Sequence, residues 1–250
     1  MISFCDIHLT KEPALKKDSP NFKYYLNALK RSPNFSGFSD DIMNEILNVF
    51  YVETWSKGDL SFEGDKTLHT FYFVVSGRIK TYKVNPETGN EFILYINAPG
   101  DIFDVICLLD GKRHDVEMEA LDDVTLLAAP IDVVREWIMK HAEFNKILLP
   151  YLADKFRVME EKANDLALFD TWTRTVKLFI KHTKVNMHGS ELKLINNLSH
   201  SEIAKIIGTS KNVINRHIQR LKNEKILHVD RKHIEIENLQ GLLNKLKNHS

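Results

Sequence analysis

The chain has 250 residues, of which 43% are hydrophobic and 27% are charged, and its 34 Lys and Arg residues balance its 34 Asp and Glu residues. A chain of this length can form two compact domains, and the apolar content is ordinary for a globular protein. No apolar run reaches the length of a membrane span and the N-terminus is too polar for a signal peptide, so we expect a cytoplasmic protein with no membrane partner.

The first part of the chain is predicted to be helical. Residues 1–37 are expected to form an extension and a helix, and helical character extends over residues 22–50. Ser39 precedes the sequence DDIMNEIL as an N-cap, and Phe38 and Met43 are spaced as a hydrophobic staple. A helix is therefore expected to begin directly after Ser39.

Residues 51–130 are predicted to form short antiparallel strands. Apolar and polar residues alternate in HTFYFVVSG, GRIKTYKV, EFILYI, HDVEMEA and VTLLAAP, and glycines punctuate this part of the chain. Alternation is typical of strands, and the glycines mark tight turns between them. We therefore expect a β-sandwich or barrel, in a domain that spans residues 38–143.

A long helix is expected next, at about residues 144–168, in a dimerisation segment of residues 144–169. Its apolar residues recur at alternating intervals of three and four, the heptad pattern of a coiled-coil seam: Leu149, Leu152, Phe156, Met159, Ala163 and Leu166. A core helix lying on its own barrel is the alternative. We expect a homodimer, because the seam is longer than one small barrel could cover.

Residues 198–227 have the pattern of a helix-turn-helix. Ser199 and Glu202 form a capping box, and Gly208 stands where a helix can end in the left-handed conformation. Ser210 is the expected N-cap of a second helix. The buried face of that helix is predicted to comprise Val213, Ile214, Ile218 and Leu221. Its polar face comprises Lys211, Asn212, Asn215, Arg216 and Gln219.

This polar face carries the side-chain types that read bases in the major groove. Arginine pairs with guanine, and asparagine or glutamine pairs with adenine. The alternative is a solvated face on an ordinary helical hairpin. Two short alternating runs follow Leu227 around Asp230, Arg231 and Lys232, which predicts a hairpin and hence a winged helix within residues 170–250. We therefore expect double-stranded DNA as the partner.

Charge is unevenly distributed along the chain. Residues 171–250 contain 15 basic and 6 acidic side chains, whereas residues 1–170 contain 19 basic and 28 acidic ones. A basic module joined to an acidic one is expected when only one end of a protein contacts phosphates. The basic segment coincides with the predicted helix-turn-helix and supports DNA binding independently of the motif.

The order of these elements resembles the cAMP receptor protein and fumarate/nitrate regulator (CRP/FNR) family of bacterial transcription factors, from about Phe35 to Leu242. The matching segments are NFSGFSDDIMNEIL, LSFEGDKTLHTFYFVVSGRIKTYKV, the PGDIF turn, the long helix and LSHSEIAKIIGTSKNVINRHIQRLKNEKIL. The resemblance implies an α+β fold with an antiparallel β-roll sensor, a dimerisation helix and a C-terminal winged helix. It also implies a homodimer that binds a roughly palindromic site and works with RNA polymerase.

By position in the family, the resemblance implies that Lys211, Asn212 and Arg216 read bases, and Arg216 matches the family's guanine-reading arginine. Asn215 lies on the same predicted face and is counted with them. Lys211 and Asn212 stand where the best-known member has arginine and glutamate, so the half-site is expected to differ from that member's. Contacts to phosphate are implied for His200, Ser210, Arg231 and Lys232.

Cyclic-nucleotide binders of this family hold the phosphate with a Gly-Glu pair after the PGD turn and an Arg-Ser pair further along. Those positions hold Asp104 and Val105, then His114 and Asp115. Two aspartates would repel a phosphate and the bidentate arginine is missing, so cAMP is not expected to bind. Arg113 is one residue away, and a shift of the alignment would restore part of the site. A different effector, no effector, or a cyclic nucleotide in a non-standard pocket are the options left.

An enzyme is the competing class, because cupin-type dioxygenases and isomerases have rolls of this shape. Those enzymes need several histidines and a carboxylate around a metal, whereas only His69 and His114 lie between residues 51 and 130. Haem ligation by either histidine is left open. Cys5 and Cys107 are too few for a disulfide framework or a four-thiolate iron–sulfur cluster. We expect no catalytic residues, metal or cofactor.

Overall fold

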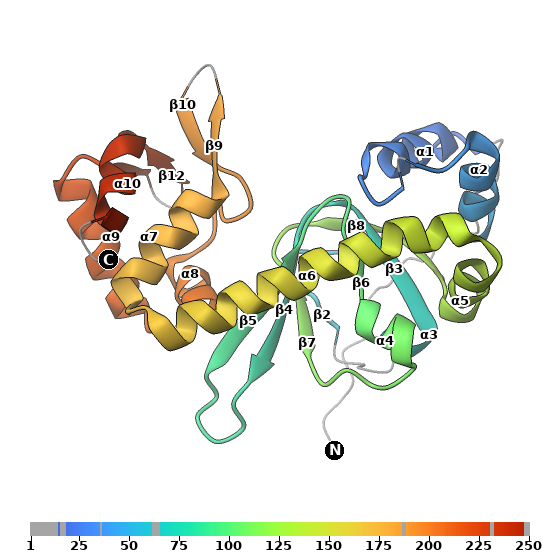
Figure 1. Cartoon of the computed structure of the whole chain (residues 1–250), viewed down its shortest axis with the longest axis horizontal. Helices are drawn as coiled ribbons and strands as arrows, with labels where there is room; N and C mark the ends of the chain where they lie inside the picture. The colour runs from blue at the N-terminus through green and yellow to red at the C-terminus, as the bar shows by residue number, and fades with distance from the viewer. Residues whose placement is uncertain are drawn as a thin grey trace. The chain divides into compact units, whose positions relative to one another are not determined.

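The structure of the chain is a computed structural model, which describes residue 15 and residues 19–35, 37–61, 66–186, 189–230 and 233–247. Figure 1 shows its helices and strands. The chain divides into two compact units. The first unit contains Met1–Lys83 and Tyr95–Phe156, and the second contains Val84–Leu94 and Arg157–Ser250.

Most residues of two four-stranded sheets belong to the first unit, whereas their residues 84 and 91–94 belong to the second. The described pairings within these sheets are antiparallel. One sheet has the order β1 (Tyr51–Trp55), β8 (Val124–Pro130), β3 (Thr70–Ser76) and β6 (Ile102–Phe103). The other has the order β2 (Leu60–Ser61), β7 (Glu117–Ala120), β4 (Ile79–Val84) and β5 (Glu91–Asn97). These sheets confirm the expected β-roll.

Strand β3 is buried on both of its faces. Phe71, Phe73 and Val75 join a core that contains residues of the surrounding helices. Tyr72 and Val74 join a second core that includes residues of both sheets. A strand with one buried face has alternating apolar and polar residues, whereas a strand buried on both faces is continuously apolar. The helices that cover the second face of β3 therefore explain its continuous apolar run.

The first unit also contains the helices α1 (Phe22–Arg31), α2 (Asp40–Val49), α3 (Lys66–His69), α4 (Val105–Asp110) and α5 (Ile131–Lys140). The predicted N-cap of α2 is confirmed, and the two residues of the predicted staple belong to one buried core. Ile42 N donates to Ser39 Oγ at 3.4 Å, and Phe38 and Met43 are both buried.

The predicted helical segment over residues 22–50 is interrupted between α1 and α2. Pro33 follows Ser32, and a residue that precedes proline is pushed out of the helical region. Ser32 is accordingly extended, with φ of −74° and ψ of 129°. Ser32 Oγ and Asn34 Nδ2 then each donate to the Gly100 carbonyl oxygen at 2.9 Å, so this connection holds the PGD turn.

The long helix α6 (Ala142–Leu168) confirms the predicted helix within two residues at its start. Its first half belongs to the first unit and its second half to the second. Phe144, Leu148 and Tyr151 are buried in the core of the first unit. This buried face differs from the predicted seam, which therefore lies elsewhere on the helix.

The second unit contains α7 (Thr171–His182), α8 (His200–Ile207), α9 (Lys211–Asn223) and α10 (Leu239–Lys247). Its sheet has the order β11 (Leu227–Asp230), β12 (His233–Ile236), β10 (Gly189–Leu192) and β9 (Thr183–Asn186). The β11–β12 hairpin confirms the predicted wing. The β9–β10 hairpin was not predicted, because its sequence is polar and lacks clear alternation. Among the described residues, no helix is long and apolar enough to cross a membrane.

Candidate nucleic-acid interface and small-molecule cavity

The helix-turn-helix is built by the local signals that the sequence contains. Glu202 N donates to Ser199 Oγ at 3.1 Å at the start of α8. Gly208 ends this helix in the left-handed conformation, with φ of 72°. Val213 N donates to Ser210 Oγ at 3.4 Å at the start of α9. These contacts satisfy backbone groups that the helix ends leave free and so define the turn between the two helices.

Helix α9 separates a buried face from a polar one. Ile214, Ile218 and Leu221 are fully buried, whereas Val213, which was expected with them, is half-buried. Four polar residues are exposed, and their side chains form no hydrogen bond or ion pair within the described part of the chain: Lys211, Asn212, Arg216 and Gln219. Their donors and acceptors are therefore available to a ligand.

Asn215 and His200, which were also predicted to contact DNA, are neither exposed nor free. Asn215 is half-buried, and its Oδ1 lies 2.6 Å from His200 Nδ1. The other ring nitrogen, His200 Nε2, is buried and has no hydrogen-bond partner among the residues that the structure describes. His200 was expected to contact a DNA phosphate, but its two nitrogens are engaged with Asn215 or buried, which argues against that role.

A polar and aromatic cluster fixes α9 against α7. The Thr175 hydroxyl donates to the Thr171 carbonyl oxygen at 2.7 Å, so it accepts from His217 Nδ1 at 2.9 Å. Burial lowers the pKa of His217, and the nearby Arg216 charge lowers it further. The guanidinium of Arg220 lies 4.2 Å from the centre of the Trp172 ring. These contacts hold the exposed face of α9 in a defined orientation.

The wing is described only at its base. Asp230 pairs with His233 at the end of the β11–β12 ladder. Arg231 and Lys232, the predicted phosphate contacts between these strands, lie outside the described residues. Their role stays a prediction.

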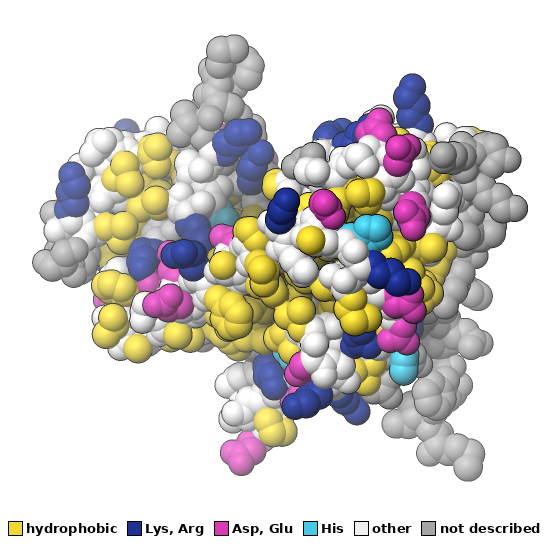
Figure 2. Space-filling model, turned by 45° about the vertical axis from the view of Figure 1, so that its right-hand side comes forward, with side chains coloured by type: hydrophobic (Ala, Val, Ile, Leu, Met, Phe, Trp, Pro, Cys, Tyr) yellow, Lys and Arg dark blue, Asp and Glu magenta, His cyan; other side chains and the backbone are white. Residues whose placement is uncertain are grey.

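The predicted seam of α6 is largely uncovered in the single chain. Leu149, Phe156 and Leu166 are 61%, 75% and 44% exposed. Ala163 is also exposed, whereas Leu152 and Met159 are half-buried. Figure 2 shows hydrophobic side chains exposed on the face of the molecule that it draws. Exposed large apolar residues at heptad spacing are typical of a helix that packs against a partner.

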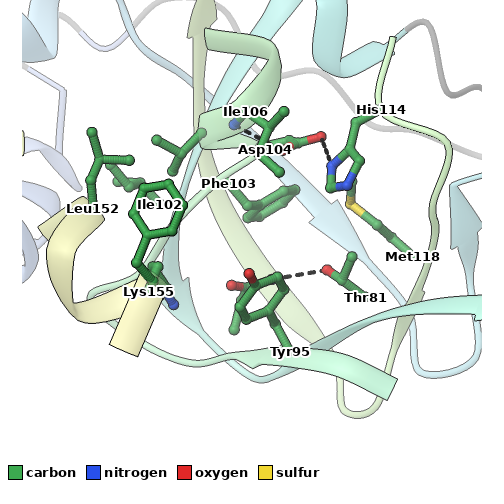
Figure 3. Close-up of a pocket in the computed structure, with 13 residues that line it drawn as sticks. Thr81, Tyr95, Ile102, Phe103, Asp104, Ile106, His114, Met118, Leu152 and Lys155 are labelled. Atoms are coloured by element: carbon green, nitrogen blue, oxygen red, sulfur yellow. Dashed lines mark hydrogen bonds and ion pairs between the residues drawn. The ribbon is translucent and has the colours of Figure 1, made fainter. Parts of the chain in front are cut away.

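A cavity of about 110 Å³ lies in the first unit between the roll and α6 (Figure 3). Thirteen residues line it: Thr81, Tyr95, Asn97, Ile102, Phe103, Asp104, Val105, Ile106, His114, Met118, Leu152, Lys155 and Phe156. Most of this lining is apolar, which suits an organic ligand that is fixed by a few polar groups.

A buried acid lies at one side of this cavity. Asp104 Oδ2 accepts from His114 Nδ1 at 2.8 Å and from Cys107 Sγ at 3.3 Å, and Asp104 Oδ1 accepts from Ile106 N at 3.1 Å. Burial raises the pKa of the Cys107 thiol. The Asp104 carboxylate is thus held by three donors, and it faces the cavity together with His114 (Figure 3).

Two of the five residues predicted for this pocket do not reach it. Arg113 is exposed and does not line the cavity. Asp115 is exposed and pairs with Lys83, with 3.1 Å between Oδ2 and Nζ. Both side chains are exposed, whereas His114, between them, lines the cavity. Arg113 therefore does not replace the missing arginine of the family, and only one aspartate remains at the cavity.

Helix α6 contributes Lys155 to the polar part of the cavity lining. Lys155 Nζ donates to Asp101 Oδ1 at 3.1 Å and lies 5.7 Å from the centre of the Tyr95 ring. Burial, followed by the Asp104 charge, raises the pKa of Tyr95. Burial, followed by the Asp101 charge, also raises the pKa of Tyr151, whose hydroxyl donates to the Ile102 carbonyl oxygen at 2.8 Å. Neither Tyr95 of β5 nor Lys155 of α6 was predicted from the sequence to line this cavity.

The described residues contain no group of three or more His, Cys, Asp and Glu side chains that could hold a metal ion. His69 is exposed at the end of α3, away from the lining of the cavity. His114 lines the cavity and is bonded to Asp104. Cys5 lies outside the described residues.

Two protein-family models match the chain, one in the N-terminal part and one in the C-terminal part. Residues 52–141 match the model of the cyclic nucleotide-binding domain, and residues 173–245 match that of the Crp-like helix-turn-helix domain. The chain is 23% identical to a CRP-like cAMP-activated global transcriptional regulator of Mycobacterium tuberculosis, over 75% of this chain and 84% of that protein.

Solved structures share the fold. A CooA mutant from Carboxydothermus hydrogenoformans matches with a TM-score of 0.68 at 22% identity, over 81% of this chain and 90% of that one. A CRP/FNR-family regulator from Thermus thermophilus matches with a TM-score of 0.61 at 19% identity, over 78% and 98%. Given the two matched domains in this order and the shared fold, the chain belongs to the CRP/FNR family of transcriptional regulators.

Proposed function

We propose that this regulator binds DNA sequence-specifically as a homodimer, at a roughly palindromic site, through α9. The observation that carries the proposal is a set of exposed side chains on that helix that have no partner in the described part of the chain: Lys211, Asn212 and Arg216. In a helix-turn-helix the second helix enters the major groove, where such groups meet base edges. A rigidly held helix with free donors and acceptors is suited to that reading.

Each side chain has a base that it fits. The Arg216 guanidinium can donate two bonds to guanine, and the Asn212 carboxamide can both donate to and accept from adenine. Lys211 can donate to guanine. Ser210 at the N-terminus of α9 is suited to a phosphate, which helix N-termini favour, and the wing residues Arg231 and Lys232 are proposed as further phosphate contacts.

Dimerisation is proposed through the α6 seam. Phe156 and Leu149 are more than half exposed in the single chain, and pairing with a second copy of the helix would remove both from water. Two-fold symmetry would present two copies of α9 to successive turns of DNA, which explains why the site should be roughly palindromic.

The cavity is proposed to hold an effector other than cAMP, or none. Asp104, the N-cap of α4, carries an acid at a position that the family resemblance assigns to phosphate binding, and it is 8% exposed. Among the described residues no arginine lines the cavity, and Lys155 is already paired with Asp101. A phosphate would therefore meet a buried negative charge without a bidentate partner.

Binding to duplexes from the protein's own promoter region, followed by fluorescence anisotropy, tests the proposal. Affinity should fall by about a thousandfold or more between about 50 and 200 mM salt. Arg216→Ala should weaken the specific complex by about 1 to 3 kcal/mol. Arg157→Ala removes the same charge from an exposed position on α6 and serves as the matched control. Equal loss in the two variants would contradict base reading by Arg216.

A further inference from the structure

The cavity between the roll and α6 is small. Its volume is about 110 Å³, whereas an apolar cavity of roughly 150 Å³ in another protein binds benzene. The part of a ligand that lies inside this cavity is therefore about the size of one ring. A nucleotide, which has a base, a sugar and a phosphate, is larger than this space. The volume therefore favours a small organic ligand.

The charged side chains that line the cavity already have partners. Among the described lining residues, Asp104 is the one acid, and Lys155 and His114 are the two basic residues. His114 Nδ1 lies 2.8 Å from Asp104 Oδ2, and Lys155 Nζ lies 3.1 Å from Asp101 Oδ1. A charged ligand would add an unpaired charge to a largely apolar cavity, at a cost that an uncharged ligand avoids.

At least two hydrogen-bonding groups of the lining are available to a ligand. His114 Nδ1 donates its proton to the Asp104 carboxylate, and Nε2 of the same ring has no hydrogen-bond partner among the described residues. Thr81 Oγ1 accepts from Asn97 Nδ2 at 3.2 Å, which leaves its own proton free to donate. Thr81 pairs with Met118 in the β4–β7 ladder. Figure 3 shows Thr81, Met118 and His114 along one side of the cavity.

A hydroxyl group fits this pair of groups. A neutral imidazole that donates through Nδ1 accepts at Nε2, so His114 can accept the proton of a ligand hydroxyl. The oxygen of that hydroxyl can accept from Thr81 Oγ1. If the imidazole is protonated, Nε2 donates instead, and the hydroxyl oxygen can accept this bond as well.

We propose that the cavity binds an uncharged, ring-sized organic molecule through a hydroxyl group that is held by His114 and Thr81. The inference rests on the proposed function, because it names a chemical class for the effector of the same cavity.

Five small molecules separate the effects of the hydroxyl group, charge and size. Phenol is the probe, and toluene has a methyl group in place of the hydroxyl. Benzoate and benzylammonium carry a negative and a positive charge, and adenosine is uncharged but larger. Ligand-observed NMR measures their dissociation constants with the full-length protein in the absence of DNA. Phenol should bind at least about fivefold more tightly than toluene, the scale of one net hydrogen bond, and more tightly than the other three molecules.

Two variants test the assigned contacts. His114→Phe keeps a ring of similar size but removes Nε2, so toluene should bind this variant more tightly than phenol. Retained binding of toluene shows that the cavity of the variant is intact. Thr81→Val is nearly isosteric and should weaken the binding of phenol by about fivefold, again the scale of one hydrogen bond, while the affinity for toluene is retained. His69→Phe is the matched control, because His69 is exposed and does not line the cavity.

The affinities of the wild-type protein test the inference even if a variant does not fold. Absence of phenol binding, or tighter binding of any of the other four molecules, would overturn it. An unchanged preference for phenol over toluene in His114→Phe would overturn it as well. Binding to the promoter duplexes is measured separately. A protein that binds phenol but no DNA would refute the proposed DNA-binding function and leave this inference intact, so the two failures are distinguishable.

Discussion

Replacing Phe156 with glutamate should dissociate the proposed dimer. Phe156 is 75% exposed in the single chain. A phenylalanine can bury roughly 200 Å², so about 150 Å² per protomer remains to be covered. At about 25 cal/mol per Å² that area is worth up to about 4 kcal/mol in each protomer. Glutamate removes this gain and places a charge from each protomer in the proposed interface, so the loss should reach several orders of magnitude in the dimer dissociation constant.

Sedimentation equilibrium at micromolar concentration measures this loss. Wild-type protein should sediment as a dimer and Phe156→Glu as a monomer with the same far-UV circular dichroism. Met139→Glu is the matched control, because Met139 is 77% exposed but lies on α5. A dimeric Phe156→Glu variant, or equal dissociation of both variants, would refute the assignment of the seam.

Three further outcomes follow from the structure. Glu119→Ala should cost about 3 kcal/mol in unfolding free energy, because it removes the carboxylate that lies 2.7 Å from the buried ammonium of Lys80. Asp115→Ala, which breaks only the exposed pair with Lys83, should cost less than about 1 kcal/mol, and urea denaturation compares the two. Burial, followed by the charges of two nearby lysines, lowers the pKa of His182 from 6.5 to about 4. The contribution of this histidine to the free energy of unfolding is therefore complete above pH 6.5 and is lost as the pH falls towards 4. His182→Gln should therefore flatten the stability profile between pH 7 and pH 4, and an unchanged slope would contradict this cause. Millimolar cAMP should leave the thermal midpoint of the wild-type protein unchanged, whereas a concentration-dependent rise would show that cAMP binds.

Local signals in the sequence predicted the DNA-binding unit well. Ser199, Gly208 and Ser210 act within a few residues of themselves, and the structure shows each in its expected role. The spacing of apolar residues in α9 was sufficient to predict most of its buried face, because the residues on one face of a helix are determined by their local spacing. The roll was likewise predicted from alternation and turns, and the structure adds helical cover on the outer face of β3.

Contacts between distant segments could not be predicted in this way. Asn215 was expected to be free, since its position on α9 places it among outward residues. The partner that holds it, His200, lies 15 residues away on another helix. Arg113 and Asp115 were predicted to line the pocket but are exposed. They lie in an irregular segment, where the direction of each side chain depends on a backbone path that the sequence pattern does not specify. The contribution of Lys155 to the cavity depends on how α6 packs on the roll, which periodicity alone does not specify.

Sequence-specific binding of a dimer through α9 is most directly tested by native mass measurement and affinity on one selected duplex. The intact palindrome should bind two chains per duplex, at least about a thousandfold more tightly than a duplex with both half-sites scrambled. One chain per duplex, or equal affinity for the intact and scrambled duplexes, would contradict the account.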